Sequence, residues 1–184
     1  AGFAVPLLQR LTLEGVVAPQ CVRVLVLVPT RELAEQVYAS FRSYGGNLPL
    51  RSFVAYGGVP IEPQISKLRK GLDVLVATPG RLLDLQTQGA VKFEQVQTLV
   101  LDEADRMLDL GFERELDLLL MTMPKQRQTL LFSATFSDAI RAMAKTMLKD
   151  PVSVEVSARN STVKAVKQSV IVCDKKRKPE LFLH

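Results

Sequence analysis

Cysteine and histidine are scarce in this sequence, which has two cysteines, Cys21 and Cys173, and one histidine, His184. The cysteines lie far apart and belong to no C-x-x-C or Cys/His cluster, a pattern typical of reduced thiols in a cytosolic protein. No run approaches the roughly eighteen apolar residues that a membrane-spanning helix needs, and no signal-peptide pattern is present. We therefore expect a cytoplasmic protein with no membrane partner, and we assign His184 no role.

A large excess of charge is also missing, because the formal net charge is only +5. One basic run, at residues 175–178, supplies four positive charges, so the remainder of the chain is nearly neutral. Bulk charge therefore does not argue for nucleic acid, and any nucleic-acid site must be local. The phosphate-binding loop GxxxxGK followed by Ser or Thr occurs nowhere in the sequence.

The chain does contain regularly spaced apolar runs. Its 184 residues, 47% of them hydrophobic, are enough for one domain with a substantial core. Short apolar runs alternate with segments of helical periodicity, which predicts an α/β fold with a parallel sheet and right-handed crossovers. Six strands are expected, at residues 22–28, 52–56, 73–77, 98–101, 129–132 and 152–156.

Three carboxylates follow the apolar run at residues 98–101, namely Asp102, Glu103 and Asp105. The run is typical of a buried parallel strand, which would place Asp102 and Glu103 at the edge where open α/β sheets bind ligands. Adjacent carboxylates there suit a hydrated magnesium ion, with one facing the metal shell and the other orienting or deprotonating a water. A solvated acidic turn is the alternative that carboxylate spacing alone leaves open.

Two other predicted strands end in a threonine, a helix start and an arginine. The first junction is Pro29-Thr30-Arg31 and the second is Thr78-Pro79-Gly80-Arg81. A helix start at the carboxyl end of a strand is a ready anion site, and an arginine adds a charged donor. Two such junctions on one rim can grip successive phosphates without reading bases. Ordinary helix capping with a surface arginine is the alternative.

Taken together, these motifs resemble those of the DEAD-box RNA helicases. Asp102-Glu103-Ala104-Asp105 resembles the family signature, and the other matching stretches occur in the family's order. They are PTREL at residues 29–33, a glycine pair at Gly57 and Gly58, TPGR at residues 78–81 and SAT at residues 133–135. The sequences of these motifs and of the residues around them look most similar to those of the bacterial RhlE-like group. The resemblance implies an ATP-dependent enzyme that unwinds RNA duplexes and is built from two RecA-like domains.

The resemblance also implies roles for individual residues. Asp102 and Glu103 would bind ATP and Mg²⁺, with the metal held through water. Ser133 and Thr135 would hydrogen-bond to the acidic motif around Asp105 and so link nucleotide state to domain closure. The implied catalytic residues are Asp102, Glu103, Asp105, Ser133 and Thr135. The residues implied to contact the backbone of single-stranded or duplex RNA are Pro29, Thr30, Arg31, Gly57, Gly58, Thr78, Pro79, Gly80 and Arg81.

The absent phosphate loop is a departure from the family. We expect a RecA-like sheet of the P-loop NTPase type that is flanked by helices and lacks the phosphate-loop strand, with Ala1 following the missing loop. Residues 1–158 are expected to form the first RecA-like domain, incomplete at its N-terminus, and residues 159–184 a linker and the start of the second. These residues alone are expected to be inactive. A non-catalytic RNA- or protein-binding module on the same fold, or a DNA helicase, stays open.

Overall fold

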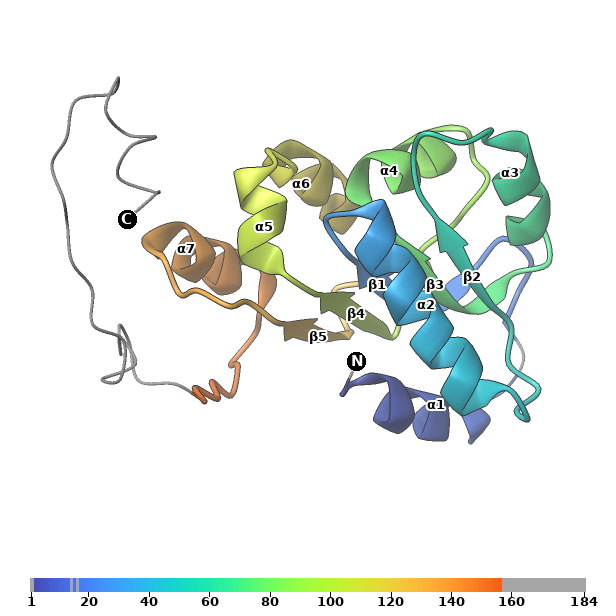
Figure 1. The fold of residues 1–184 in the computed structure, drawn as a ribbon, viewed down its shortest axis with the longest axis horizontal. Coiled ribbons are helices and arrows are strands. Elements are labelled where there is room, and N and C mark those ends of the chain that lie inside the picture. Colours follow the sequence, from blue (N-terminus) through green and yellow to red (C-terminus); the bar gives the residue numbers. More distant parts are fainter. Residues whose placement is uncertain (1, 14, 16, 157–184) are drawn as a thin grey trace, which may run out of the picture. The chain divides into compact units, whose positions relative to one another are not determined.

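A single parallel sheet organises the chain (Figure 1). The computed structural model describes residues 2–13, 15 and 17–156. Within this part of the chain, five strands lie in the order β2-β3-β1-β4-β5, and all four strand pairs are parallel. The strands are β1 (Val22–Leu27), β2 (Ser52–Ala55), β3 (Leu72–Ala77), β4 (Thr98–Leu101) and β5 (Gln128–Leu131). The expected α/β architecture is confirmed.

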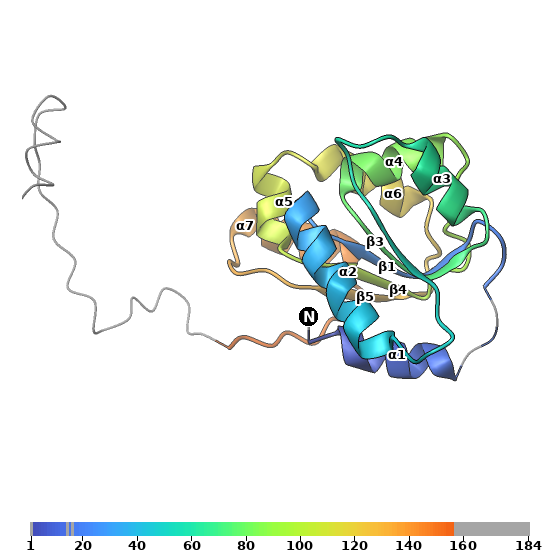
Figure 2. The same ribbon diagram turned by 45° about the vertical axis from the view of Figure 1, so that its right-hand side comes forward.

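Helices cover both faces of the sheet (Figure 2). One buried apolar cluster packs α1 and α2 against one face, and the other packs α3, α4, α5, α6 and α7 against the opposite face. Every residue of β1, β3 and β4 is buried, which explains why these strands are almost continuous hydrophobic runs. The helices are α1 (Ala4–Thr12), α2 (Arg31–Gly45), α3 (Glu62–Leu68), α4 (Pro79–Thr87), α5 (Ala104–Asp109), α6 (Glu113–Met121) and α7 (Asp138–Met147).

A buried ion pair lies inside the sheet, between Arg23 of β1 and Asp73 of β3. The two residues are only 5% and 4% exposed. Arg23 Nε donates to Asp73 Oδ1 at 3.1 Å, and Nη2 of the same guanidinium contacts the same oxygen. The other carboxylate oxygen, Oδ2, accepts from the backbone N–H of Arg51 at 2.6 Å. One carboxylate therefore ties together β1, β3 and the residue that precedes β2.

Two expectations about apolar residues are wrong. Residues 152–156 form no strand, because no strand within the described residues pairs with them, and Val152, Val154 and Val156 are 90%, 76% and 95% exposed. The sheet consequently has five strands where six were expected. The apolar residues of the segment 106–123 also predict a core position for Leu110, but this residue is 53% exposed because it lies at the C-terminal end of α5, next to the turn at Gly111.

Contacts divide the chain into a unit of residues 1–149 and a unit of residues 150–184. The expected domain boundary after residue 158 lies outside the described residues and stays a prediction. No helix in the described part of the chain is long and apolar enough to cross a membrane.

Candidate functional site

The carboxyl ends of all five strands meet at one edge of the sheet, and every predicted site residue follows one of these ends. The strand order decides how the residues are sorted along that edge. Gly57 and Gly58 follow β2, the TPGR residues 78–81 follow β3, and residues 29–31 follow β1. The acidic residues 102–105 then follow β4, and the SAT residues 133–135 follow β5. The implied RNA-contacting residues are therefore adjacent to one another, and the implied catalytic residues are adjacent on the other side.

Asp102 continues the line of β4, and its backbone N–H donates to Leu27 O at 3.0 Å. Burial raises the pKa of the Asp102 carboxyl, and the nearby charge of Glu103 raises it further. A hydrogen bond from Glu103 N to Asp102 Oδ1 at 3.1 Å lowers the pKa but does not outweigh these effects. A cation placed beside this half-buried carboxylate would offset the cost of its lost hydration. Asp102 is therefore suited to face a metal.

Glu103 has left-handed backbone angles, φ 54° and ψ 52°, and directly precedes α5. Such a conformation costs a non-glycine residue about 1–2 kcal/mol, and strain of this kind is concentrated at functional sites. The Glu103 side chain is 41% exposed, and its Oε2 lies 3.5 Å from Arg106 Nη1. Its carboxylate is thus held near the edge of the sheet and remains open to water.

Asp105 joins the ends of β4 and β5. Its Oδ2 accepts from Thr135 N at 3.1 Å and from Thr135 Oγ1 at 3.0 Å, and Ser133 Oγ donates to Thr135 O at 2.7 Å. Burial alone would raise the pKa of Asp105, but hydrogen bonds from Thr135, Arg106 and Ser133 outweigh it and lower the pKa. The Thr135 contact with Asp105 is the one that the resemblance implied, and its link to nucleotide state stays a prediction.

The acidic residues do not form a complete metal cage. Within the described residues, no group of three or more His, Cys, Asp or Glu side chains is placed to hold a metal ion. Asp102 and Glu103 instead offer two carboxylates, which fits an ion that keeps several waters and is shared with phosphates. This donor set suits a hydrated Mg²⁺ better than a metal held entirely by protein ligands.

The two helix starts differ in their capping. Thr30 caps α2, because its hydroxyl accepts from Leu33 N at 3.2 Å. Thr78 occupies the equivalent position before α4, and Pro79 is the first residue of that helix, but the Thr78 side chain makes no capping hydrogen bond. Thr78 is buried, so it is not ready-made as an exposed anion ligand.

Contacts connect the three junctions that carry the implied RNA-contacting residues. The Arg31 guanidinium lies 4.8 Å from the centre of the Tyr56 ring, and the Tyr56 hydroxyl donates to Glu35. Arg81 Nη2 donates to Val59 O at 2.9 Å, so α4 is attached to the segment that follows the glycine pair. The residues after β1, β2 and β3 are therefore held as one surface.

Arg81 is the most unusual of these residues. Its side chain is only 10% exposed, yet within the described chain Nε and Nη1 make no hydrogen bond, and Asp84 lies 4.0 Å from Nε. Buried donors rarely remain without an acceptor. Arg81 Nε and Nη1 are thus two buried donors that lack a hydrogen-bond acceptor within the described chain.

Glycines leave open space around this surface. Gly58 has φ +78°, which favours glycine, and a Cβ at Gly57 or Gly58 would meet nothing within 4 Å. A Cβ at Gly80 would lie 4.0 Å from Phe112, an ordinary contact. The protein's own packing therefore does not require glycine at Gly57 or Gly80, and the space beside them is available to a ligand backbone.

Sequence reasoning missed three partners in the site: Tyr56, the Val59 carbonyl and Arg106. Two of them carried a signal. Tyr56 directly precedes the glycine pair, and Arg106 lies three residues after Glu103, a spacing at which side chains meet on a helix. The Val59 carbonyl carried none, because a backbone acceptor has no sequence identity.

Comparisons with known proteins agree with this geometry. The family model described as DEAD/DEAH box helicase matches residues 1–143. DEAD-box ATP-dependent RNA helicase CshA of Geobacillus kaustophilus is 39% identical over 182 residues, 99% of this chain and 38% of the relative. ATP-dependent RNA helicase DDX47 of Drosophila melanogaster is 40% identical over 183 residues, 99% of this chain and 35% of the relative.

The chain spans about a third of the length of these relatives. The family match covers the whole sheet and the edge that carries the candidate residues. The chain therefore belongs to the DEAD/DEAH box helicase family and corresponds to the N-terminal domain of a DEAD-box RNA helicase.

Proposed function

We propose that the protein containing this chain binds single-stranded or duplex RNA through its backbone and couples ATP hydrolysis to RNA unwinding. The observation that carries this proposal is the order of the candidate residues along the edge where the strands have their carboxyl ends. Cationic and glycine residues follow β2, β3 and β1, while carboxylates and hydroxyls follow the adjacent β4 and β5. The relatives compared above are named ATP-dependent RNA helicases, which supports the same activity.

On the acidic side, Glu103 is proposed to orient or deprotonate the attacking water, since its carboxylate is open to solvent. Asp102 is proposed to face Mg²⁺, whose charge would offset that of the ATP phosphates. Asp105 Oδ2 accepts a hydrogen bond from Thr135 Oγ1 at 3.0 Å, so a shift at the end of β4 would be transmitted to the end of β5. This contact is the proposed route from nucleotide to domain closure, with a second RecA-like domain as the partner.

On the RNA side, Arg81 and Arg31 are proposed to contact phosphates, with Gly57, Gly58 and Gly80 allowing close approach. Pro29, Thr30, Thr78 and Pro79 position these residues through the starts of α2 and α4. Phosphate contacts position a nucleic acid without reading its sequence. Binding is therefore expected to tolerate sequence changes and to weaken with salt.

Replacing Arg81 with alanine should lower the affinity for RNAs of different sequence by similar factors. The substitution removes one proposed phosphate contact, so the slope of log affinity against log salt should also fall in magnitude by about 0.7 to 1. Fluorescence anisotropy with labelled U-rich, A-rich and mixed 12-mers, each at several salt concentrations, measures both quantities.

The matched control is Arg114→Ala, which removes an exposed arginine from α6 on the same domain. We expect this control to change neither the affinity nor the salt slope. A change in sequence preference on Arg81→Ala, or equal losses in the two variants, would argue against a phosphate contact at Arg81.

We also propose a place in the RhlE-like group and a cytoplasmic location. The motif wording at residues 74–85 and 99–112 supports the first, although the relatives compared above carry other subgroup names. The second is supported by the cysteines, which have no disulfide or metal spacing, with Cys21 free and buried.

A further inference from the structure

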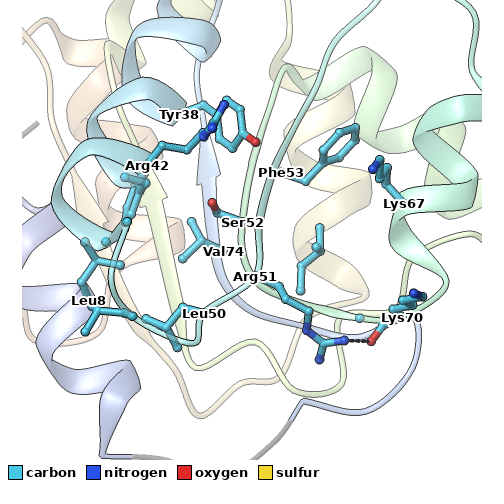
Figure 3. Close-up of a pocket in the computed structure, with 16 residues that line it drawn as sticks. Leu8, Tyr38, Arg42, Leu50, Arg51, Ser52, Phe53, Lys67, Lys70 and Val74 are labelled. Atoms are coloured by element: carbon cyan, nitrogen blue, oxygen red, sulfur yellow. Dashed lines mark hydrogen bonds between the residues drawn. The ribbon is translucent and has the colours of Figure 1, made fainter.

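A groove of about 500 Å³ lies at the opposite end of β2 from the glycine pair (Figure 3). It is formed where the C-terminal ends of α2 and α3 flank the beginning of β2. The candidate RNA residues follow the other end of this strand, about 13 Å away for four residues of extended chain. The groove therefore belongs to neither half of the site described above.

The charges of the groove have one sign. Arg42, Arg51, Lys67 and Lys70 line it, and within the described chain no Asp or Glu is among the lining residues. Arg51 is held in place, because its Nη1 donates to Lys70 O at 2.5 Å (Figure 3). Lys67 and Lys70 are exposed and form no salt bridge within the described residues. The groove is thus complementary to an acidic ligand.

The two walls of the groove differ in chemistry. On the α1 and α2 side the lining is mainly apolar and includes Leu8, Leu48 and Leu50, with Arg42 at the rim. On the α3 side lie Lys67 and Lys70, with Phe53 beside Lys67 (Figure 3). A ligand that filled the groove would meet aliphatic groups on one side and ammonium groups on the other.

The groove borders a free edge of the sheet, since Ser52 and Phe53 of β2 line it and β2 is one of the two outermost strands. Arg51 O accepts from Asp73 N at 2.8 Å and Ala55 O accepts from Thr78 N at 3.1 Å, so these two residues face β3. Backbone groups alternate along a strand, so the N–H and C=O of Ser52, which lines the groove, and of Val54, two residues further along β2, point away from β3. Open strand edges of this kind bind extended peptides by adding a strand.

We propose that this groove binds an extended acidic segment of a partner protein, which pairs with the free edge of β2. Successive side chains of an added strand point to opposite faces. Aliphatic side chains of the segment would pack beside Leu8 and Leu50, while alternate carboxylates would meet Lys67 and Lys70. The open backbone groups favour a polypeptide over RNA, because RNA has no matching ladder of N–H and C=O groups.

A fluorescein-labelled ten-residue peptide in which aspartate alternates with valine is the probe. Fluorescence anisotropy on the full chain should show saturable binding, and the double variant Lys67→Glu/Lys70→Glu should weaken it about tenfold. The control Arg114→Glu/Lys125→Glu makes the same charge change at exposed positions outside the groove and should alter the affinity by less than about twofold.

Three further probes separate the parts of the proposal. Peptides that alternate lysine with valine, or aspartate with serine, should bind more weakly than the probe. Two versions of the probe carry methyl groups on alternate backbone nitrogens, one on the odd-numbered and the other on the even-numbered residues. Only the version that has lost the N–H groups facing β2 should bind more weakly. Hydrogen exchange at the Ser52 and Val54 amides should slow when the probe is bound.

Absence of saturable binding at millimolar peptide would overturn the proposal, as would equal losses in the two double variants. A U-rich 12-mer tests the other macromolecule, and a greater loss of its binding in Lys67→Glu/Lys70→Glu than in the control would make the groove an RNA site. Each of these results leaves the Arg81 prediction unaffected, because Arg81 lies beyond the other end of β2.

Discussion

Glu103→Gln should lower RNA-stimulated ATP hydrolysis by about a hundredfold or more while ATP binding is retained. The substitution belongs in a protein that joins this chain to a phosphate loop and a second RecA-like domain. Glutamine keeps the shape of the side chain and its contact distance to Arg106, but it cannot accept a proton from the attacking water. Steady-state hydrolysis with saturating RNA measures the loss, and a fluorescent ATP analogue measures binding.

The control for this prediction is Glu113→Gln, which changes an exposed glutamate in the first turn of α6. It should hydrolyse ATP at the parent rate. Turnover at the parent rate by Glu103→Gln would remove Glu103 from the proposed role. A parallel loss of ATP binding would assign Glu103 to nucleotide affinity instead.

Asp73→Ala should destabilise the domain by about 3–5 kcal/mol, the usual cost of removing one member of a buried ion pair. The variant removes the Asp73 carboxylate that contacts the buried Arg23 guanidinium, and the Arg51 N–H loses its acceptor. Urea denaturation followed by circular dichroism, in the same protein, measures the free energy of unfolding.

Two comparisons make the cause of this loss distinguishable. Asp84→Ala removes a carboxylate that is 65% exposed and 4.0 Å from Arg81, and it should cost less than about 1 kcal/mol. The double variant Arg23→Met/Asp73→Leu replaces the pair with apolar groups and should be more stable than Asp73→Ala. Equal losses in Asp73→Ala and Asp84→Ala would show that burial of the pair contributes nothing.

The sheet and its functional edge were predictable because the signal is local. Apolar runs such as Val22–Leu27, interrupted only by Arg23, identify buried parallel strands, and parallel strands end at a common edge. The residues that follow those runs are therefore gathered together whatever their distance in sequence. The start of α2 is likewise a local signal, because Thr30, which directly follows the apolar run, caps this helix.

Other features depend on neighbours that no local pattern identifies. Residues 152–156 alternate valine with polar residues, yet a strand also needs a partner, and none of the described strands pairs with them. Arg81 was predicted for the site, but its burial against Val59 depends on how the segment after β2 passes α4. The groove beside β2 exists because strand order places β2 at an edge, and composition does not encode that order.

The measurement that tests the account most directly is displacement of a labelled strand from a short RNA duplex. The protein should again join this chain to a phosphate loop and a second RecA-like domain. We predict displacement by the parent protein only when ATP and Mg²⁺ are present, and none above background by Glu103→Gln. RNA binding without ATP-dependent displacement by the parent protein would contradict the account and favour a non-catalytic RNA-binding module on the same fold.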